Sequence, residues 1–463
     1  MGSEEQVRVL MVTFSYQGHL NPILRLAKLL VSKGLHVTIA TTEVARKQML
    51  KPKTSITQDT TRVHFEFFSD GLTDDFDRQK YVSSLLESLE AAGSKNLSNL
   101  ITNLTTEDKK FSCIITNPFM PWVVDVAAEH NIPCAVLWIQ ACAVYSIYYR
   151  YFNQPQLFPS LENPNEAVEL PTLPVLLVKE LPSFILPSNP IHFNKLMIKF
   201  VQNLGKVKWI LGNSFNELEE DIVASLASLK PIIPIGPLVS QFVLGKEETV
   251  TAASLDKWRA EDSCIEWLDE RPPLSVIYIS FGSITELSQN QMDSIAAALK
   301  NANRPFLWVI RPQEKKSTEL PSGFLEATKD KGLIVKWCSQ EKVLMHPAVA
   351  CFLTHCGWNS TLETVVAGVP AIAYPEWTDQ LVDAKLLVDV FKTGVRMKNE
   401  EDGTLTAEEV QRCILEVTEG PKATELKKRA MALKDAARKA AENGGSSDQN
   451  VNLFINEILG TCF

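Results

Sequence analysis

The residues from Trp337 to Gln380 bring together side chains that suit a nucleotide diphosphate and an attached sugar. Trp337 follows an apolar, β-rich run, where an indole can stack on a base, a contact worth about 1–3 kcal/mol. Asn359 sits at the expected N-cap of a helix with Ser360 in its first turn, and the free N–H groups there favour phosphate without a metal. Asp379 and Gln380 then offer an acceptor and an amide for sugar hydroxyls.

Four further residues of this segment have groups suited to the same ligand. Cys338 and Gln340 follow the first strand, where main-chain groups and an amide can approach the base edge and the ribose. His355 lies just before the helix and can donate to the phosphates, and Glu363 can accept from ribose hydroxyls. Each residue also has an ordinary structural interpretation, because a strand-end tryptophan is usually core and a Ser or Asn at a helix start is usually only a cap.

Over its whole length, the segment is similar to the signature box of plant family 1 UDP-dependent glycosyltransferases. The resemblance implies UDP-glucose as the donor substrate, with glucose favoured by the terminal Gln380, and neither a cofactor nor a metal ion. It implies donor contacts from Ser283, Trp337, Cys338, Gln340, His355, Trp358, Asn359, Ser360, Glu363, Asp379 and Gln380.

The other candidate for chemistry is His19, in a Gly-containing loop that follows the first expected strand at 7–14. Loops at the carboxyl ends of strands lie at the ligand edge of a doubly wound sheet, although an exposed loop histidine is the ordinary alternative. The resemblance implies that His19 is the catalytic histidine. The family usually pairs this histidine with an Asp after the strand at 111–116, and this chain has Asn117 there.

The amide at Asn117 predicts a particular class of acceptor. Replacing an orienting Asp by Asn costs serine proteases about 10⁴ in turnover. A phenol needs the lost base, because roughly 4 kcal/mol separates it from its anion at pH 7, whereas a carboxylic acid with a pKa near 4 arrives ionised. We therefore expect a carboxylate acceptor. Asp125 is a fallback partner for His19, with a place inside the following helix as the alternative.

Segments along nearly the whole chain, among them QGHLNP, NPFMPWV, LPSF and YPEWTDQ, are similar to the branch of this family that makes 1-O-acyl glucose esters. That branch includes indole-3-acetate and hydroxycinnamate glucosyltransferases. It implies inverting transfer to a small aromatic or indolic acid, such as a benzoic, hydroxycinnamic or indole-3-acetic acid. The alternatives are a phenol or flavonoid O-glucosyltransferase and a UDP-sugar-binding protein without turnover.

An acceptor pocket is expected beside His19. Its candidate residues are Tyr16, Gln140 and Thr378. Trp138, Tyr145 and Tyr148 lie where an apolar wall can form, and packing between helices explains them equally well.

Strands and helices alternate on both sides of a proline-spaced run at 230–254. Strands are expected at 7–14, 36–42, 63–68, 111–116, 134–139, 275–283 and 306–311, and a first helix at 22–34. This rhythm predicts an α/β protein with parallel, doubly wound sheets. It resembles the GT-B architecture of two Rossmann-like domains facing across a cleft. The expected division is an acceptor domain at 1–235, a linker at 236–260, a UDP-sugar domain at 261–445 and a C-terminal helix at 446–463 returning to the first domain.

Composition limits the partners of these 463 residues. A formal charge of −9 argues against nucleic acid, and no apolar run is long enough to insert stably in a membrane. The nine cysteines are scattered and odd in number, which favours free thiols over disulfides or zinc. The start has acids before its apolar run, unlike a signal peptide. We expect a cytoplasmic monomer with small-molecule substrates.

Overall fold

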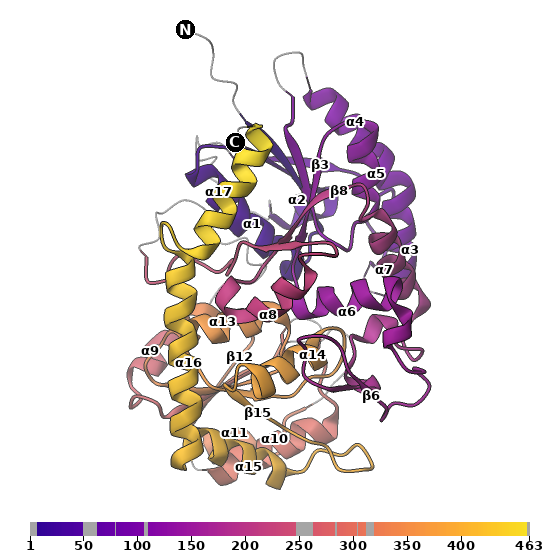
Figure 1. Ribbon diagram of the computed structural model, residues 1–463. Helices are drawn as coiled ribbons and strands as arrows, with labels where there is room; N and C mark the ends of the chain where they lie inside the picture. Colours follow the sequence, from indigo (N-terminus) through magenta and orange to yellow (C-terminus); the bar gives the residue numbers. More distant parts are fainter. Residues whose placement is uncertain are drawn as a thin grey trace.

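Two parallel β-sheets, one above the other in Figure 1, organise the chain. The computed structural model describes residues 7–49, 63–78, 80–105, 110–246, 263–282, 285–302, 304–311 and 319–460. In spatial order, the first sheet contains β3 (Val63–Phe68), β2 (His36–Thr42), β1 (Arg8–Val12), β4 (Cys113–Thr116), β5 (Cys134–Trp138), β8 (Val207–Gly212) and β9 (Ile232–Pro234). The second contains β12 (Gly332–Val335), β11 (Phe306–Val309), β10 (Val276–Ser280), β13 (Val349–Thr354), β14 (Ala371–Ala373) and β15 (Gly394–Arg396). The predicted doubly wound α/β class is confirmed.

The strands are apolar on both faces because helices cover each sheet from both sides. A short antiparallel hairpin, β6 (Ala167–Val168) and β7 (Leu176–Leu177), stands apart from the two sheets. The strands expected at 36–42 and 63–68 have the bounds of β2 and β3. Several other strands end earlier than expected. After Val12 and Val335, for example, the chain leaves the hydrogen-bonded sheet and enters a loop at its carboxyl edge.

The helices of the first part of the chain are α1 (Gln17–Ser32), α2 (Glu43–Met49), α3 (Val82–Ser88), α4 (Ser94–Leu104), α5 (Trp122–Glu129), α6 (Cys142–Asn153), α7 (Ile191–Asn203) and α8 (Asn216–Leu226). Those of the second part are α9 (Ser263–Asp269), α10 (Gln289–Ala302), α11 (Phe324–Thr328), α12 (Gln340–Leu344), α13 (Trp358–Ala367), α14 (Gln380–Lys385), α15 (Ala407–Thr418), α16 (Gly420–Ala441) and α17 (Ser446–Leu459). Within the described ranges, no helix combines the length and apolar character needed to cross a bilayer.

The first helix corrects an expectation, because α1 begins at Gln17 rather than at residue 22. The carbonyl of Tyr16 accepts from the N–H groups of His19 and Leu20 at 3.0 and 2.9 Å. His19 therefore lies in the first turn of a helix and not in a loop. Pro22 is tolerated inside this helix, near its start.

The last two helices run along both sheets, as the yellow ribbon in Figure 1 shows. α16 packs against α13 and α8, and α17 packs on the first sheet, where the rings of Phe454 and Trp209 meet edge to face at 5.2 Å. Lys33, the C-cap residue of α1, forms an ion pair with Asp448 of α17. The boundaries expected at 235, 260 and 445 stay a prediction, and 247–260 of the expected linker lie outside the described residues.

Candidate active site

His19 sits at the carboxyl edge of the first sheet among aromatic rings. The rings of Phe119 and Phe14 meet the imidazole edge to face, with centroids 4.8 and 5.4 Å away. Nδ1 of His19 is buried without a hydrogen-bond partner among the described residues. Burial lowers the pKa of His19 to about 4, which the nearby Asn117 amide opposes only in part. The imidazole is therefore neutral at pH 7.

Asn117 follows β4 directly and is fully buried. Its Oδ1 accepts from the N–H of Phe119 at 3.0 Å, and its Nδ2 donates to Oγ1 of Thr13 at 3.3 Å. An Asn that binds the backbone two residues on stabilises a tight turn. Asn117 thus fixes the turn that holds Phe119 against His19, and it brings no negative charge to the imidazole.

Asp125 is not the fallback partner of His19. It lies in α5, where its carboxylate accepts from Nζ of Lys206 at 2.7 Å and from Nδ2 of Asn203 at 3.3 Å. The acid is therefore part of a contact between α5 and the end of α7, and the alternative placement inside the helix is correct.

His355 follows β13 at the facing edge of the second sheet. Two glycines enclose its ring: a Cβ at Gly282 would lie 2.5 Å from Nε2, and one at Gly357 2.7 Å from the same atom. Burial, with a smaller effect of Arg311, lowers the pKa of His355 to about 4. Nδ1 has no partner among the described residues, so a neutral ring is available to a ligand there.

The start of α13 differs from expectation at two residues. Gly357 is the N-cap rather than Asn359, whose Nδ2 instead donates to the carbonyl of Gly18 at 3.1 Å. The indole of Trp358 is buried and donates to the carbonyl of Asn213 at 2.7 Å. Both side chains reach residues of the first part of the chain. The backbone N–H groups of this helix start remain the groups suited to phosphate.

Glu363, Gln340 and Ser360 form one hydrogen-bonded cluster. Nε2 of Gln340 donates to Oε2 of Glu363 at 2.7 Å and to Oγ of Ser360 at 2.9 Å. The hydroxyl of Tyr278 donates to Oε1 of Gln340 at 3.1 Å, which fixes the amide orientation. Burial and the neighbouring Glu341 raise the pKa of Glu363 to about 7, against the effects of Arg25 and Gln340. Gln340 and Glu363, the two residues expected near the ribose, are thus brought together with Ser360, which was expected near the diphosphate.

Trp337 and Cys338 lie in the loop that follows β12, whose last residue is Val335. Trp337 is half-buried. The Cys338 thiol is buried 3.5 Å from the hydroxyl of Tyr278, and its hydrogen bond with Cys264, followed by burial, raises its pKa well above the ordinary value. This thiol faces the core, so only the backbone of Cys338 is left for a base. Ser283 lies outside the described residues.

Asp379 and Gln380 begin α14. Oε1 of Gln380 accepts from the N–H groups of Glu376 and Trp377 at 3.0 and 3.3 Å, which leaves its Nε2 as the free donor. Oδ1 of Asp379 accepts from Oγ1 of Thr378 at 2.7 Å. This orientation gives the pair the donor and the acceptor that sugar hydroxyls require.

The acceptor candidates divide into two groups. Tyr16 is 37 % exposed with its ring 6.4 Å from that of His19, and Gln140 is buried with an unpartnered Oε1 among the described residues. The N–H of Thr378 donates to Oγ of Ser183 at 2.8 Å, and its carbonyl accepts from the N–H of Ser183 at 3.0 Å. By contrast, Trp138, Tyr145 and Tyr148 pack on one another in the core, with ring centroids 5.3 and 6.0 Å apart.

Sequence reasoning missed an aromatic row that extends from the imidazole. Phe184 lies 6.2 Å from Phe119 and 6.3 Å from Trp377, and it stacks on Phe193 at 4.6 Å. The available signal was the presence of these rings in the short segments NPFMP, LPSF and YPEW, whose prolines mark turns. The row gives the site a wall suited to a planar, apolar acceptor.

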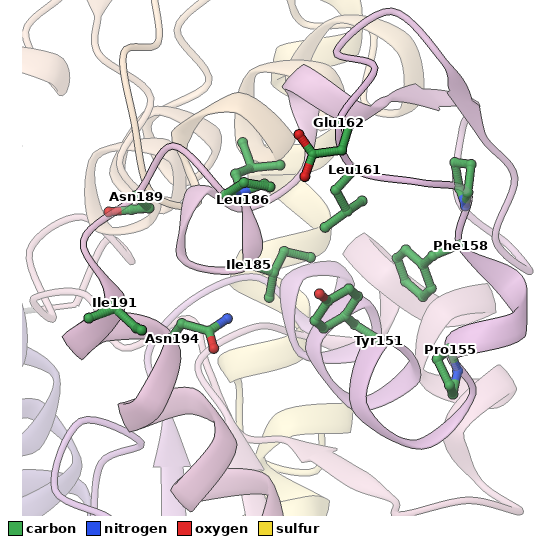
Figure 2. A pocket seen from close by; sticks show the side chains of 12 residues that line it. Tyr151, Pro155, Phe158, Leu161, Glu162, Ile185, Leu186, Asn189, Ile191 and Asn194 are labelled. Carbon is green, nitrogen blue, oxygen red and sulfur yellow. The ribbon is translucent and has the colours of Figure 1, made fainter.

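A hollow of about 580 Å³ is lined by residues of the 151–194 region, among them Ile185, which follows Phe184 (Figure 2). Tyr151, Phe158, Leu161 and Ile185 point toward its centre. None of the catalytic or donor-binding candidates lines it.

Comparisons with known proteins agree with this geometry. Residues 5–238 match the family "Glycosyltransferase, N-terminal domain", and residues 269–438 match "UDP-glucoronosyl and UDP-glucosyl transferase". UDP-glycosyltransferase 84B1 of Arabidopsis thaliana is 53 % identical over 99 % of both chains. Gallate 1-beta-glucosyltransferase of Quercus robur is 43 % identical over 99 % of this chain and 91 % of its own.

A solved structure extends the likeness to the fold. Os79 from O. sativa, in complex with UDP, superposes with a TM-score of 0.86 at 30 % identity, over 97 % of this chain and all of that one. The GT-B prediction is thereby confirmed. With its two facing sheets, its half-buried histidines at both edges and these relatives, the chain belongs to the plant UDP-glycosyltransferase family and is an enzyme of that family.

Proposed function

We propose that the enzyme transfers glucose from UDP-glucose to the carboxyl group of a small aromatic or indolic acid, with inversion, giving a 1-O-β-glucose ester. The observation that carries this proposal is the environment of His19. Burial and the amide of Asn117 are the two influences on its pKa, which lies near 4.

This environment decides between acceptor classes. For an imidazole with a pKa of about 4, taking a proton from a phenol with a pKa of about 10 costs about 8 kcal/mol. A carboxylic acid has a pKa near 4 and has lost its proton at neutral pH. His19 is therefore far too weak a base to deprotonate a phenol acceptor, whereas a carboxylate acceptor needs no base.

The reaction then requires one bond to form and one to break. A carboxylate oxygen attacks the anomeric carbon as the bond from that carbon to the diphosphate oxygen breaks, and UDP leaves with the negative charge. The neutral imidazole of His19 acts as a hydrogen-bond donor that steers the carboxylate. His355 and the N–H groups at the start of α13 stabilise the negative charge that develops on the diphosphate.

The donor roles follow from the contacts above. Trp337 and the backbone of Cys338 bind the base, Gln340, Ser360 and Glu363 bind the ribose, and Asp379 with Nε2 of Gln380 binds the sugar. Asn359 and Trp358 contribute by holding the two edges together. The planar rings of Phe119, Phe184 and Trp377 suit an aromatic acid, as the name of the gallate relative supports.

The test is a product assay. Purified enzyme is incubated with UDP-glucose and a matched panel of benzoic, hydroxycinnamic and indole-3-acetic acids and of phenols and flavonoids. We expect products that mild alkali hydrolyses, as esters require. Alkali-stable glucosides would establish the rival phenol or flavonoid activity. His19→Ala is the control, because it lowers turnover while leaving UDP binding intact.

Two finer points belong to the same proposal. Binding of the diphosphate by backbone N–H groups supports a reaction without metal or other cofactor. No disulfide links the cysteines of the described residues, which supports a reducing, cytoplasmic location.

A further inference from the structure

Arg25 joins the helix that carries His19 to the elements that bind the ribose. It lies on α1, and its side chain is 19 % exposed. Its Nη2 lies 2.6 Å from Oε1 of Glu341 on α12 and 3.6 Å from Oε1 of Glu363 on α13. Its Nη1 donates to the carbonyl of Leu238 at 2.9 Å.

The second contact between the same helices is the hydrogen bond from Asn359 to the carbonyl of Gly18. Residues seven apart on α1 and four apart on α13 lie on one face of each helix. The two contacts therefore fix one helix against the other, with His19 next to one of them. Arg25 is remote from the reacting atoms, so its effect must pass through Glu363.

We propose that Arg25 is a positioning residue for donor binding: it holds the Glu363 carboxylate as a charged acceptor for the ribose hydroxyls, and it fixes α13 against the helix of His19. The first part rests on the ribose role of Glu363 in the proposed function. The fork geometry of a guanidinium suits this task, because it bonds several oxygens at once.

The charges around Glu363 set the sign of the effect. It is faced by Arg25 from α1, by Glu341 from α12 and by the hydroxyl of Tyr278 from β10. Burial and Glu341 raise the pKa of Glu363, and Arg25 lowers it, with the balance at about 7. Below this value the carboxyl is protonated and one acceptor is lost to the ribose. Affinity for the donor therefore falls as the pH drops through about 7.

The experiment measures binding of UDP-glucose by calorimetry from about pH 5.5 to 8.5, without an acceptor. UDP-glucose is the probe because its diphosphate is a diester, free of the phosphate ionisation near pH 6 that UDP itself has. We expect Arg25→Met to move the midpoint of the pH dependence upward and to lower affinity roughly tenfold at pH 7. Glu341→Gln moves the midpoint downward.

Three comparisons make the test specific. The affinity loss in Arg25→Met is smaller for dUDP-glucose, which lacks the 2′-hydroxyl. Arg25→Lys returns the midpoint toward its wild-type value, since it restores the positive charge. Lys33→Met is the matched control: it breaks another ion pair of α1, with Asp448, and leaves the midpoint unchanged.

Midpoints that stay fixed in both variants, or that move in the same direction, overturn the proposal. If Arg25→Met does not fold, the midpoints of Glu341→Gln and Arg25→Lys still decide it. Because no acceptor is present, failure of the enzyme to form glucose esters leaves these binding results intact, and the two proposals are tested separately.

Discussion

The side chain of Asn359 donates to the carbonyl of Gly18, 3.1 Å away, and so joins the donor helix to the helix of the catalytic histidine. This carbonyl is available because the residue four positions later is Pro22, which has no N–H to donate within the helix. Pro22, which α1 tolerates near its start, thus frees an acceptor for the facing helix α13.

Pro22→Ala returns an N–H to α1, where it competes with Asn359 for the Gly18 carbonyl. We expect kcat/KM to fall about fivefold, the value of one neutral hydrogen bond, while the Tm is unchanged or higher. Steady-state kinetics and thermal unfolding together check this. A parallel loss of Tm and activity would instead mean that the substitution disrupts the helix.

Asn117→Asp introduces a carboxylate beside His19 and so raises the low pKa of this imidazole. A stronger base helps an acceptor that still carries its proton, so we expect turnover of phenols to rise at least tenfold while turnover of acids changes little. The ratio of kcat/KM for a phenol and its matched acid is the measurement. An equal change for both acceptors contradicts the role assigned to the amide.

The pH profile for acids follows from the pKa of His19, which burial lowers from its ordinary value to about 4. At saturating UDP-glucose, kcat/KM for the acid is expected to be level from about pH 5.5 to 8, because neither the imidazole nor the acceptor gains a proton there. It falls below about pH 5, where both do. A profile that rises only with an ionisation well above neutrality would show that the enzyme must deprotonate its acceptor.

Gly282→Ala adds a Cβ 2.5 Å from Nε2 of His355 at a backbone φ of +72°. The imidazole must move, and we expect UDP-glucose affinity to fall at least about tenfold, as for a lost hydrogen bond to a charged group. Gly403→Ala is the control, since it has a similar φ of +85° and no atom within 4 Å of the added Cβ. It carries the same backbone strain and leaves affinity unchanged.

Asp383 of α14 is fully buried, and its carboxyl group lies beside that of Asp379. Burial, then Asp379, then Glu219 raise its pKa well above the ordinary value. Folding therefore favours the protonated form, and stability is lost as the pH rises from the unfolded value near 4 toward the folded one.

Asp383→Asn removes this loss because the amide never ionises. We expect its Tm at pH 7 to exceed that of the wild type by about 2–4 °C, and the two to agree near pH 3. Asp389→Asn, at an exposed site paired with Lys385, is the control, and we expect no such pH-dependent gain in its Tm. A variant less stable at both pH values would mean that the ionised carboxylate has a partner in solution.

Features of the fold and the site were predictable where neighbouring residues in the sequence specify them. The strands β2 and β3 were predictable, because apolar runs form buried parallel strands. The hydrogen bonds from Gln340 on α12 to Ser360 and Glu363 on α13 were not, because they join two separate helices. The start of α1 was missed because Pro22 conceals a helix that begins before it.

The sequence by itself determined the family, the GT-B fold and the absence of an acid at position 117, since these depend on residue types and their order along the chain. Only the tertiary structure decided that Asn359 and Trp358 reach across to Gly18 and Asn213, that Asp125 belongs to Lys206, and that Arg25 meets Glu363. These contacts join residues far apart in the chain. Their existence depends on how two separately folded sheets face each other, and no local pattern of residues encodes that arrangement.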